Sequence, residues 1–275
     1  MPSNKVIGGL RWVMKTLRSS PRGLLMPFVF DLITLFALTL TTGLYARKVT
    51  EYMALISTGI ASGGTMPTNL GQIAADSTLS SYINAIGILL IMMALSAYVI
   101  YTLLQGISWW YCGRYLAKGP SLLVYMKRFA LLNLVWFIPF IILQMVQFIN
   151  LLTSRLSSPS GTITFTVALV SFVGVYLVTL SYSFALYRPT LASFGFSFRH
   201  GLTSITLISG YVLMLVLFVL ADLIVGVLGS TILQVVIGAI LIIPLVSIMR
   251  IYLFWLVSAR IAQGSTRRRG RAHPS

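Results

Sequence analysis

Long runs of apolar residues, separated by short polar connections, dominate the pattern of the chain. Each run exceeds the roughly 18 residues that indicate a helix long enough to cross a bilayer. We predict six spans, at about residues 24–45, 83–107, 129–153, 162–187, 203–228 and 231–258. The predicted fold class is therefore all-α, a polytopic membrane protein built as a bundle of six transmembrane helices.

The segment before the first span has a different pattern, in which basic and apolar residues alternate. Its basic residues are Lys5, Arg11, Lys15, Arg18 and Arg22. A helix over residues 4–18 sorts most of them to one face and places apolar residues such as Val13 and Leu17 on the other. This pattern is typical of an amphipathic helix lying along the membrane surface. An ordinary flexible basic leader is the alternative.

These patterns divide the chain into three parts. Residues 1–22 are the basic amphipathic interfacial leader, residues 23–260 the six-span membrane domain, and residues 261–275 a polybasic tail. Within the membrane domain, residues 46–82 form an external loop that is rich in Gly, Ser and Thr. This composition favours turns and irregular structure, with a short surface helix near residues 49–60 as a further expectation.

Composition agrees with a membrane protein. The chain has 57% hydrophobic and 9% charged residues, and its mean hydropathy is +0.93. A soluble domain carries about 25% charged residues, so this chain lacks the polar surface of a soluble protein. Its single cysteine, Cys112, excludes an internal disulfide and a cysteine-based metal cluster.

The distribution of arginine and lysine predicts the orientation of the spans. The leader contributes five basic residues, the connection between spans two and three four, the connection between spans four and five two, and the segment after span six five. The opposite side holds only Arg47, Lys48 and Arg155. Because cytoplasmic loops carry the excess of basic residues, we predict a protein of the cell membrane with both termini in the cytoplasm.

Two connections and the last hairpin carry a family resemblance. The stretches "YLAKGPSLLVYMKRF" and "GFSFRHGL", together with the hairpin that contains Pro244, resemble a broad, largely uncharacterised family of six-helix integral membrane proteins. That family is similar to the membrane domain of glycerophosphodiester phosphodiesterases. The resemblance covers spans two to six and rests on pattern, without a diagnostic motif. It implies an all-helical bundle with both ends in the cytoplasm, and it implies no activity.

The residues that carry most enzyme chemistry are scarce. The chain has four acidic residues, Asp31, Glu51, Asp76 and Asp222, and two histidines, His200 and His273. They form no metal-binding motif, no local carboxylate pair and no phosphate-binding glycine loop. We therefore expect no enzymatic activity, no catalytic residue, no bound metal and no cofactor.

Asp31 lies in the middle of the first span, where an ionised carboxylate costs about 2.5–3.5 kcal/mol even on insertion scales. Arg250 is the one basic residue inside a predicted span. Asp31 lies nine residues after Arg22, and Arg250 ten residues before Arg260, so both lie about 14 Å from their flanking arginines. The matching depths predict a structural intramembrane ion pair. A proton or solute site is the alternative.

Two further sites are predicted at the membrane boundaries. Asp222, near the outer end of span five, is a candidate polar site, either a boundary carboxylate or a solute contact. The tail carries Arg267, Arg268, Arg269 and Arg271. These arginines are expected to contact anionic lipid headgroups, with about 1 kcal/mol for each basic residue near the surface. Contact of the tail with ribosomal RNA and a role in topology alone are the alternatives.

Three functions remain open from the sequence. The first is a non-enzymatic membrane protein with an organising, assembly or accessory role. The second is a small-solute transporter or permease subunit that acts as an oligomer, and the third is an insertase-like protein whose tail contacts ribosomes. The expected partners are membrane lipids with anionic headgroups, together with a membrane protein or a second copy of the chain. Nucleic acid is not expected, apart from that contact with the ribosome.

Overall fold

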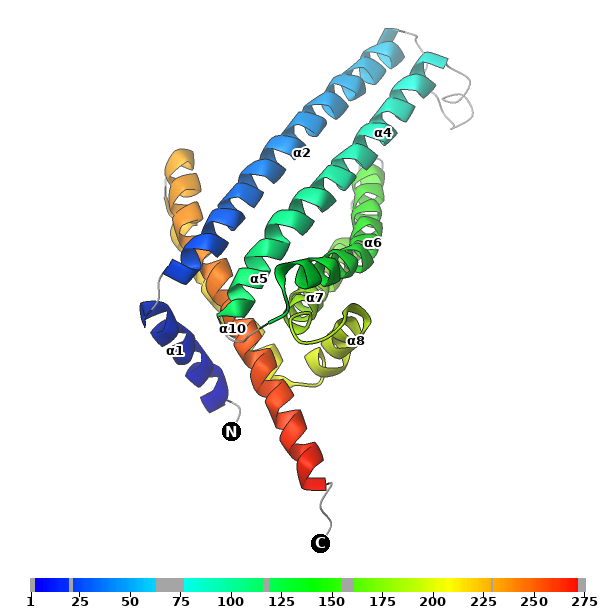
Figure 1. Cartoon of the computed structure of the whole chain (residues 1–275). Coiled ribbons are helices and arrows are strands. Elements are labelled where there is room, and N and C mark those ends of the chain that lie inside the picture. Colours follow the sequence, from blue (N-terminus) through cyan, green and yellow to red (C-terminus); the bar gives the residue numbers. More distant parts are fainter. Residues whose placement is uncertain are drawn as a thin grey trace. The chain divides into compact units, whose positions relative to one another are not determined.

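The computed structural model describes residues 3–19, 22–62, 77–115, 119–154, 161–228 and 230–271. These residues are helical almost throughout, and no strand occurs among them (Figure 1). The helices are α1 (Ser3–Ser19), α2 (Arg22–Ser62), α4 (Ser77–Ile100), the π-helical turn η1 (Tyr101–Gln105), α5 (Gly106–Arg114), α6 (Leu122–Ser154), α7 (Gly161–Phe184), α8 (Thr190–Gly201), α9 (Ile205–Gly226) and α10 (Thr231–Arg271).

Six of these helical stretches are long and apolar enough to cross a membrane. They are Gly23–Ile56, Ser80–Arg114, Leu122–Leu143, Ile163–Phe184, Ile205–Gly226 and Leu233–Ala262. Each overlaps one of the spans predicted from the sequence, so the all-α polytopic fold class is confirmed. The short helix α8 lies between the fourth and fifth spans, where the sequence predicts a connection.

The first span differs from its predicted extent. The loop expected at residues 46–82 is helical up to Ser62, because α2 continues without a break; residues 63–76 lie outside the described residues. Extending an existing helix needs no new nucleation. One turn of this extension is also stabilised by contacts of Glu51 with Arg47 Nε at 3.2 Å and with Lys48 Nζ at 2.8 Å.

The C-terminal helix also continues past its predicted end. α10 runs to Arg271, so the backbone of the predicted tail at residues 261–275 is helical over most of its length. The side chains of Arg267, Arg268, Arg269 and Arg271 lie outside the described part of the structure. Their contact with lipid headgroups stays a prediction.

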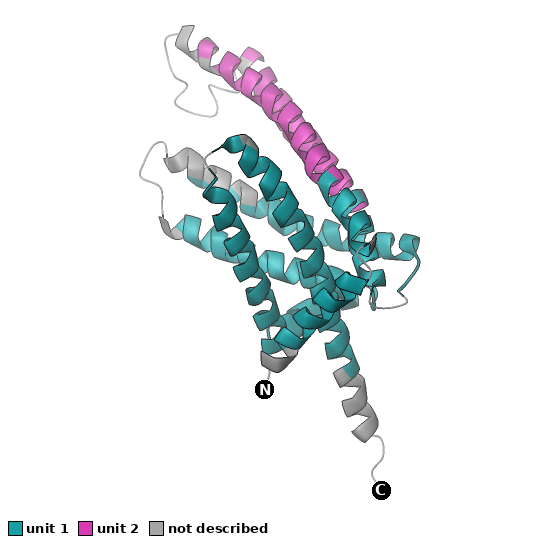
Figure 2. Cartoon of the chain, turned by 90° about the vertical axis from the view of Figure 1, so that its left-hand side faces the viewer, with its two compact units in different colours: residues 1–32, 104–275 teal, residues 33–103 magenta. Residues whose placement is uncertain are grey.

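The chain divides into two compact units, coloured separately in Figure 2. The smaller unit comprises residues 33–103, and the larger one comprises residues 1–32 and 104–275. In the smaller unit the later part of α2 pairs with α4. Tyr45 Oη lies 3.3 Å from Ser96 Oγ, and the rings of Tyr52 and Tyr82 lie 5.8 Å apart.

The core of the larger unit is aromatic. The Trp109 ring on α5 packs edge-on against Tyr182 of α7 at 5.5 Å and against Phe254 of α10 at 5.7 Å. Phe129 of α6 adds a ring 4.3 Å from that of Tyr182. Gly210 lets α9 approach α10 closely, because a Cβ atom there would lie 2.4 Å from the Leu256 side chain. Aromatic rings from α5, α6, α7 and α10 thus form this core.

Helix α1 packs against α9 and α10 of this unit (Figure 1). Its side chains Val6, Val13 and Leu17 are buried, and Tyr252 Oη donates to the Val6 carbonyl at 3.1 Å. The predicted helix is present, but this apolar face contacts protein where the sequence pattern favours contact with lipid. Other apolar side chains of α1, such as Met14, remain exposed. Placement of that second face at the membrane surface stays a prediction.

Candidate functional site

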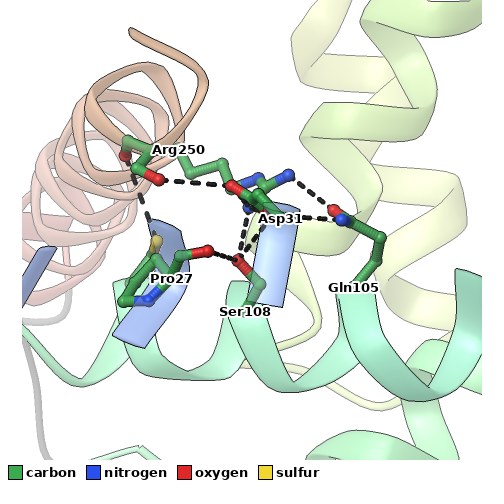
Figure 3. Close-up of polar contacts among 7 residues, drawn as sticks. Pro27, Asp31, Gln105, Ser108 and Arg250 are labelled. Carbon is green, nitrogen blue, oxygen red and sulfur yellow. Dashed lines mark hydrogen bonds and ion pairs between the residues drawn. The ribbon is translucent and has the colours of Figure 1, made fainter. Parts of the chain in front are cut away.

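Asp31 of α2 and Arg250 of α10 meet inside the larger unit (Figure 3). Arg250 Nη1 lies 2.7 Å from Asp31 Oδ1 and 2.8 Å from Oδ2. Each side chain is only 7% exposed. The acid and the base that lie at matching depth in the first and last spans therefore form a direct ion pair, as their positions in the sequence predict.

Three neutral side chains complete what we call the Asp31 cluster: Gln105, Ser108 and Ser247. Gln105 Nε2 donates to Asp31 Oδ1 at 3.0 Å, and its Oε1 accepts from Arg250 Nη2 at 2.5 Å. Ser108 Oγ lies 2.9 Å from Asp31 Oδ1, and Ser247 Oγ lies 3.2 Å from Oδ2. The carboxylate thus accepts from four different side chains.

Helical spacing brings these residues to one place. Gln105 and Ser108 are three residues apart, at the junction of η1 with α5, and Ser247 and Arg250 are three residues apart on α10. Residues at this spacing lie on the same side of a helix. The π-helical turn just before α5 inserts an extra residue into the helix, a feature common near functional sites. Asp31 therefore faces one polar pair at the junction of η1 with α5 and another on α10.

The cluster is electrically balanced. One carboxylate and one guanidinium cancel in charge, and the remaining groups are neutral donors and acceptors. The Arg250 guanidinium also lies 5.2 Å from the centre of the Trp109 ring, close enough for a cation–π contact. Desolvation of each charge costs several kcal/mol, which only good geometry and additional hydrogen bonds offset. This arrangement supplies both.

The hydrogen bonds determine what the cluster can do chemically. Both Asp31 oxygens accept hydrogen bonds from the Arg250 guanidinium and from neutral side chains. A carboxylate so occupied has little hydrogen-bonding capacity left for a solute. The geometry therefore favours a structural role, in which the cluster holds the first, second and last spans together.

The other predicted residues lie apart from this cluster. Asp222 is exposed on α9, four residues before the helix ends at Gly226, and it is not among the side chains bonded to Asp31 or Arg250. Glu51 pairs locally on α2. His200 lies near the end of α8, where burial, followed by the charges of Arg260, Arg199 and Arg188, lowers its pKa from the ordinary histidine value.

The sequence does not single out Gln105, Ser108 or Ser247. Serine and glutamine recur throughout the apolar runs, so their presence alone gives no signal. A usable signal is their spacing: Ser247 precedes Arg250 by three residues, and Gln105 precedes Ser108 by three. Polar pairs at this spacing in a span mark a polar stripe that must face protein.

Among the described residues, no group of three or more His, Cys, Asp or Glu side chains is placed to hold a metal ion. Comparison with protein-family models, with curated proteins and with solved structures gives no significant match. The functional argument therefore rests on the geometry of the chain itself.

Proposed function

We propose that this chain is a non-enzymatic multi-pass protein of the cell membrane with an organising, assembly or accessory role. The observation that carries the proposal is the saturated Asp31 cluster. Its only carboxylate is bonded to Arg250, Ser108, Gln105 and Ser247, so the charged groups buried in the spans are committed to one another. Such a cluster holds helices together and leaves no reactive group to a substrate.

The same cluster is the basis for a second candidate, a transporter or permease subunit that acts as an oligomer. An ionisable residue inside a membrane is a functional-site candidate by default, and π-helical turns occur frequently at functional sites. Asp31 and the turn at residues 101–105 meet both descriptions. Transport would require the Asp31–Arg250 bond to break during the cycle.

One experiment separates the two candidates. The full chain is extracted with its surrounding lipid, and proteins that co-purify in near-equal amount are identified; half of the sample is reconstituted for measurements of electrogenic solute flux. The organising role predicts a stoichiometric protein partner and no flux. A flux that Asp31→Asn abolishes, with folded protein retained, would replace the organising role by transport.

We propose further that both termini lie in the cytoplasm. The support is the basic residues, which concentrate in the leader, in the two connections between even and odd spans and after the last span. In a Cys112→Ser background, single cysteines at Ser62 and Ser265 should label from opposite sides of the membrane. Labelling of both positions by an impermeant reagent added outside intact cells would contradict the six-span orientation.

The insertase-like role has a separate test, because it depends on the tail. It predicts that the protein co-sediments with ribosomes and that deletion of residues 265–275 abolishes this. The resemblance to the six-helix family of glycerophosphodiester phosphodiesterase membrane domains remains part of the proposal. It supports a membrane role without catalysis, since the resemblance itself implies no activity.

A further inference from the structure

A small cavity lies where α9 begins beside the later part of α10, within the larger unit. Its volume is about 40 Å³, and its polar lining comes from Ser204, Thr206 and Arg260, with Trp255 beside them. We call it the Ser204 cavity. A cavity of this size holds about three waters, or a small polar group whose outer part stays outside. No residue of the Asp31 cluster lines this cavity.

Ser204 is the unusual residue of this cavity. It occupies the N-cap of α9, is only 6% exposed, and makes no side-chain bond to the helix that it caps. Its hydroxyl forms no hydrogen bond with any other side chain or backbone group in the described part of the chain. The hydroxyl oxygen is not fully enclosed, because Tyr187 Oη is the one fully buried side-chain polar atom without a partner among the described residues. Since Ser204 lines the cavity, its hydroxyl is available to a group bound there.

The backbone around Ser204 adds further donors. Its carbonyl accepts from the N–H groups of Leu207 and Ile208, so the backbone hydrogen bonds of the helix begin at Ser204. The N–H groups of Ile205 and Thr206 come before the first helical bonds and have no acceptor one turn back. Together with the positive end of a 22-residue helix, they favour a negatively charged group.

The charged residues around the cavity also favour a negatively charged group. Arg260 lines it, and the guanidinium groups of Arg199 and Arg188 are close enough to lower the pKa of the neighbouring His200. Along α9 the closest acid is Asp222, which is 18 residues from Ser204, about 27 Å of helix, and no described acid forms an ion pair with Arg260. Among the residues that the structure describes, the positive charge of Arg260 is therefore not paired with an acid.

We propose that the Ser204 cavity binds a phosphate group, carried either by a lipid headgroup or by a small soluble phosphate. The Ser204 hydroxyl and the first N–H groups of α9 donate to its oxygens, and the Arg260 guanidinium supplies the opposite charge. Arginine and a helix N-terminus are the usual recognition elements for phosphate. This site is independent of the organising role proposed above and holds equally for a transporter.

The test uses the full chain in phosphatidylcholine nanodiscs and measures dissociation constants by calorimetry. One arm titrates a water-soluble short-chain phosphatidic acid, and the other titrates inorganic phosphate at constant ionic strength. Ser204→Ala and Arg260→Gln should each weaken binding about tenfold or more, because each removes a charge-assisted contact. Two controls should stay within about twofold of wild type: Thr203→Ala, the exposed neighbour, and Arg11→Gln, an exposed arginine on α1.

Each outcome decides the proposal. Binding of the phosphatidic acid alone, with the expected variant pattern, assigns the site to a lipid headgroup; equal sensitivity to inorganic phosphate assigns it to a soluble phosphate. The proposal is overturned if neither probe binds saturably or if Ser204→Ala and Arg260→Gln both bind as wild type. It is also overturned if Arg11→Gln weakens binding as much as Arg260→Gln, since that shows a general surface effect.

Discussion

Two arginines on α10, ten residues apart, have opposite surroundings. Arg250 is buried and bonded to Asp31, Ser108 and Gln105. Arg260 is exposed beside a cavity lined by hydroxyl groups and has no ion pair with any described acid. The chain itself supplies the counter-charge of the first arginine, whereas no described acid pairs with the second.

The comparison explains how a protein with so few acids arranges its charge. Of the three acidic residues that the structure describes, Asp31 is the one buried against a cation. A buried cation needs such a partner, because removal from water costs several kcal/mol. A cation at the membrane boundary stays hydrated and can bind headgroups or soluble anions. Depth in the membrane therefore separates a structural arginine from a ligand-binding one.

The largest expected effect comes from neutralising the buried arginine. Arg250→Gln should lower the free energy of unfolding by about 3–5 kcal/mol, because it leaves the Asp31 carboxylate buried without its cation. Arg260→Gln removes the same charge from the same helix and should change stability by less than about 0.5 kcal/mol. Denaturant titration of both variants in the same lipid system measures the difference. Equal losses would mean that the two arginines do not differ in role.

A smaller loss is expected from the hydroxyl of Ser108. Ser108 is fully buried, and Ser108→Ala removes its contacts with Asp31 and Arg250 while keeping the ion pair. We expect a loss of about 1–3 kcal/mol. Ser258→Ala is the control, since Ser258 on α10 donates to the Trp255 carbonyl and takes no part in the Asp31 cluster. A Ser108 variant as stable as this control would show that Ser108 does not support the pair.

The smallest expected effect is on His200. Its pKa is lowered first by burial and then by nearby cations, of which Arg260 is the first. Arg260→Gln should therefore raise the pKa of His200 toward the ordinary value, whereas Arg114→Gln, at the end of α5, should leave it unchanged. Titration of the histidine ring followed by NMR measures this shift. An unchanged pKa in both variants would place Arg260 too far from His200 to contribute to the charge around the Ser204 cavity.

Some parts of this description follow from the sequence alone. The spans follow from hydropathy, because twenty apolar residues have few alternatives to a membrane helix. The contact of Asp31 with Arg250 follows from counting residues inward, because every helical residue advances by about 1.5 Å. The extent of α2 does not follow, since the glycine- and serine-rich composition after residue 46 favours a loop although the helix continues to Ser62.

The remaining parts depend on packing. The π-helical turn at residues 101–105 adds a residue to the second span, so α-helical spacing counted from the start of that span does not predict that Gln105 and Ser108 face Asp31. The Ser204 cavity is hidden for a different reason. A serine beside a helix start predicts an N-cap bond, and only the packed structure shows that Ser204 is buried without that bond.

The central claim, that Asp31 and Arg250 lock the first and last spans together, is tested most directly by a double-mutant cycle. Unfolding free energies are measured for wild type, Asp31→Asn, Arg250→Gln and the double variant in the same nanodiscs. We expect each single change to be strongly destabilising and the double variant to recover much of the loss, with a coupling energy above about 2 kcal/mol. If the two single losses add up to the loss of the double variant within about 0.5 kcal/mol, the two residues do not stabilise one another and the claim is contradicted.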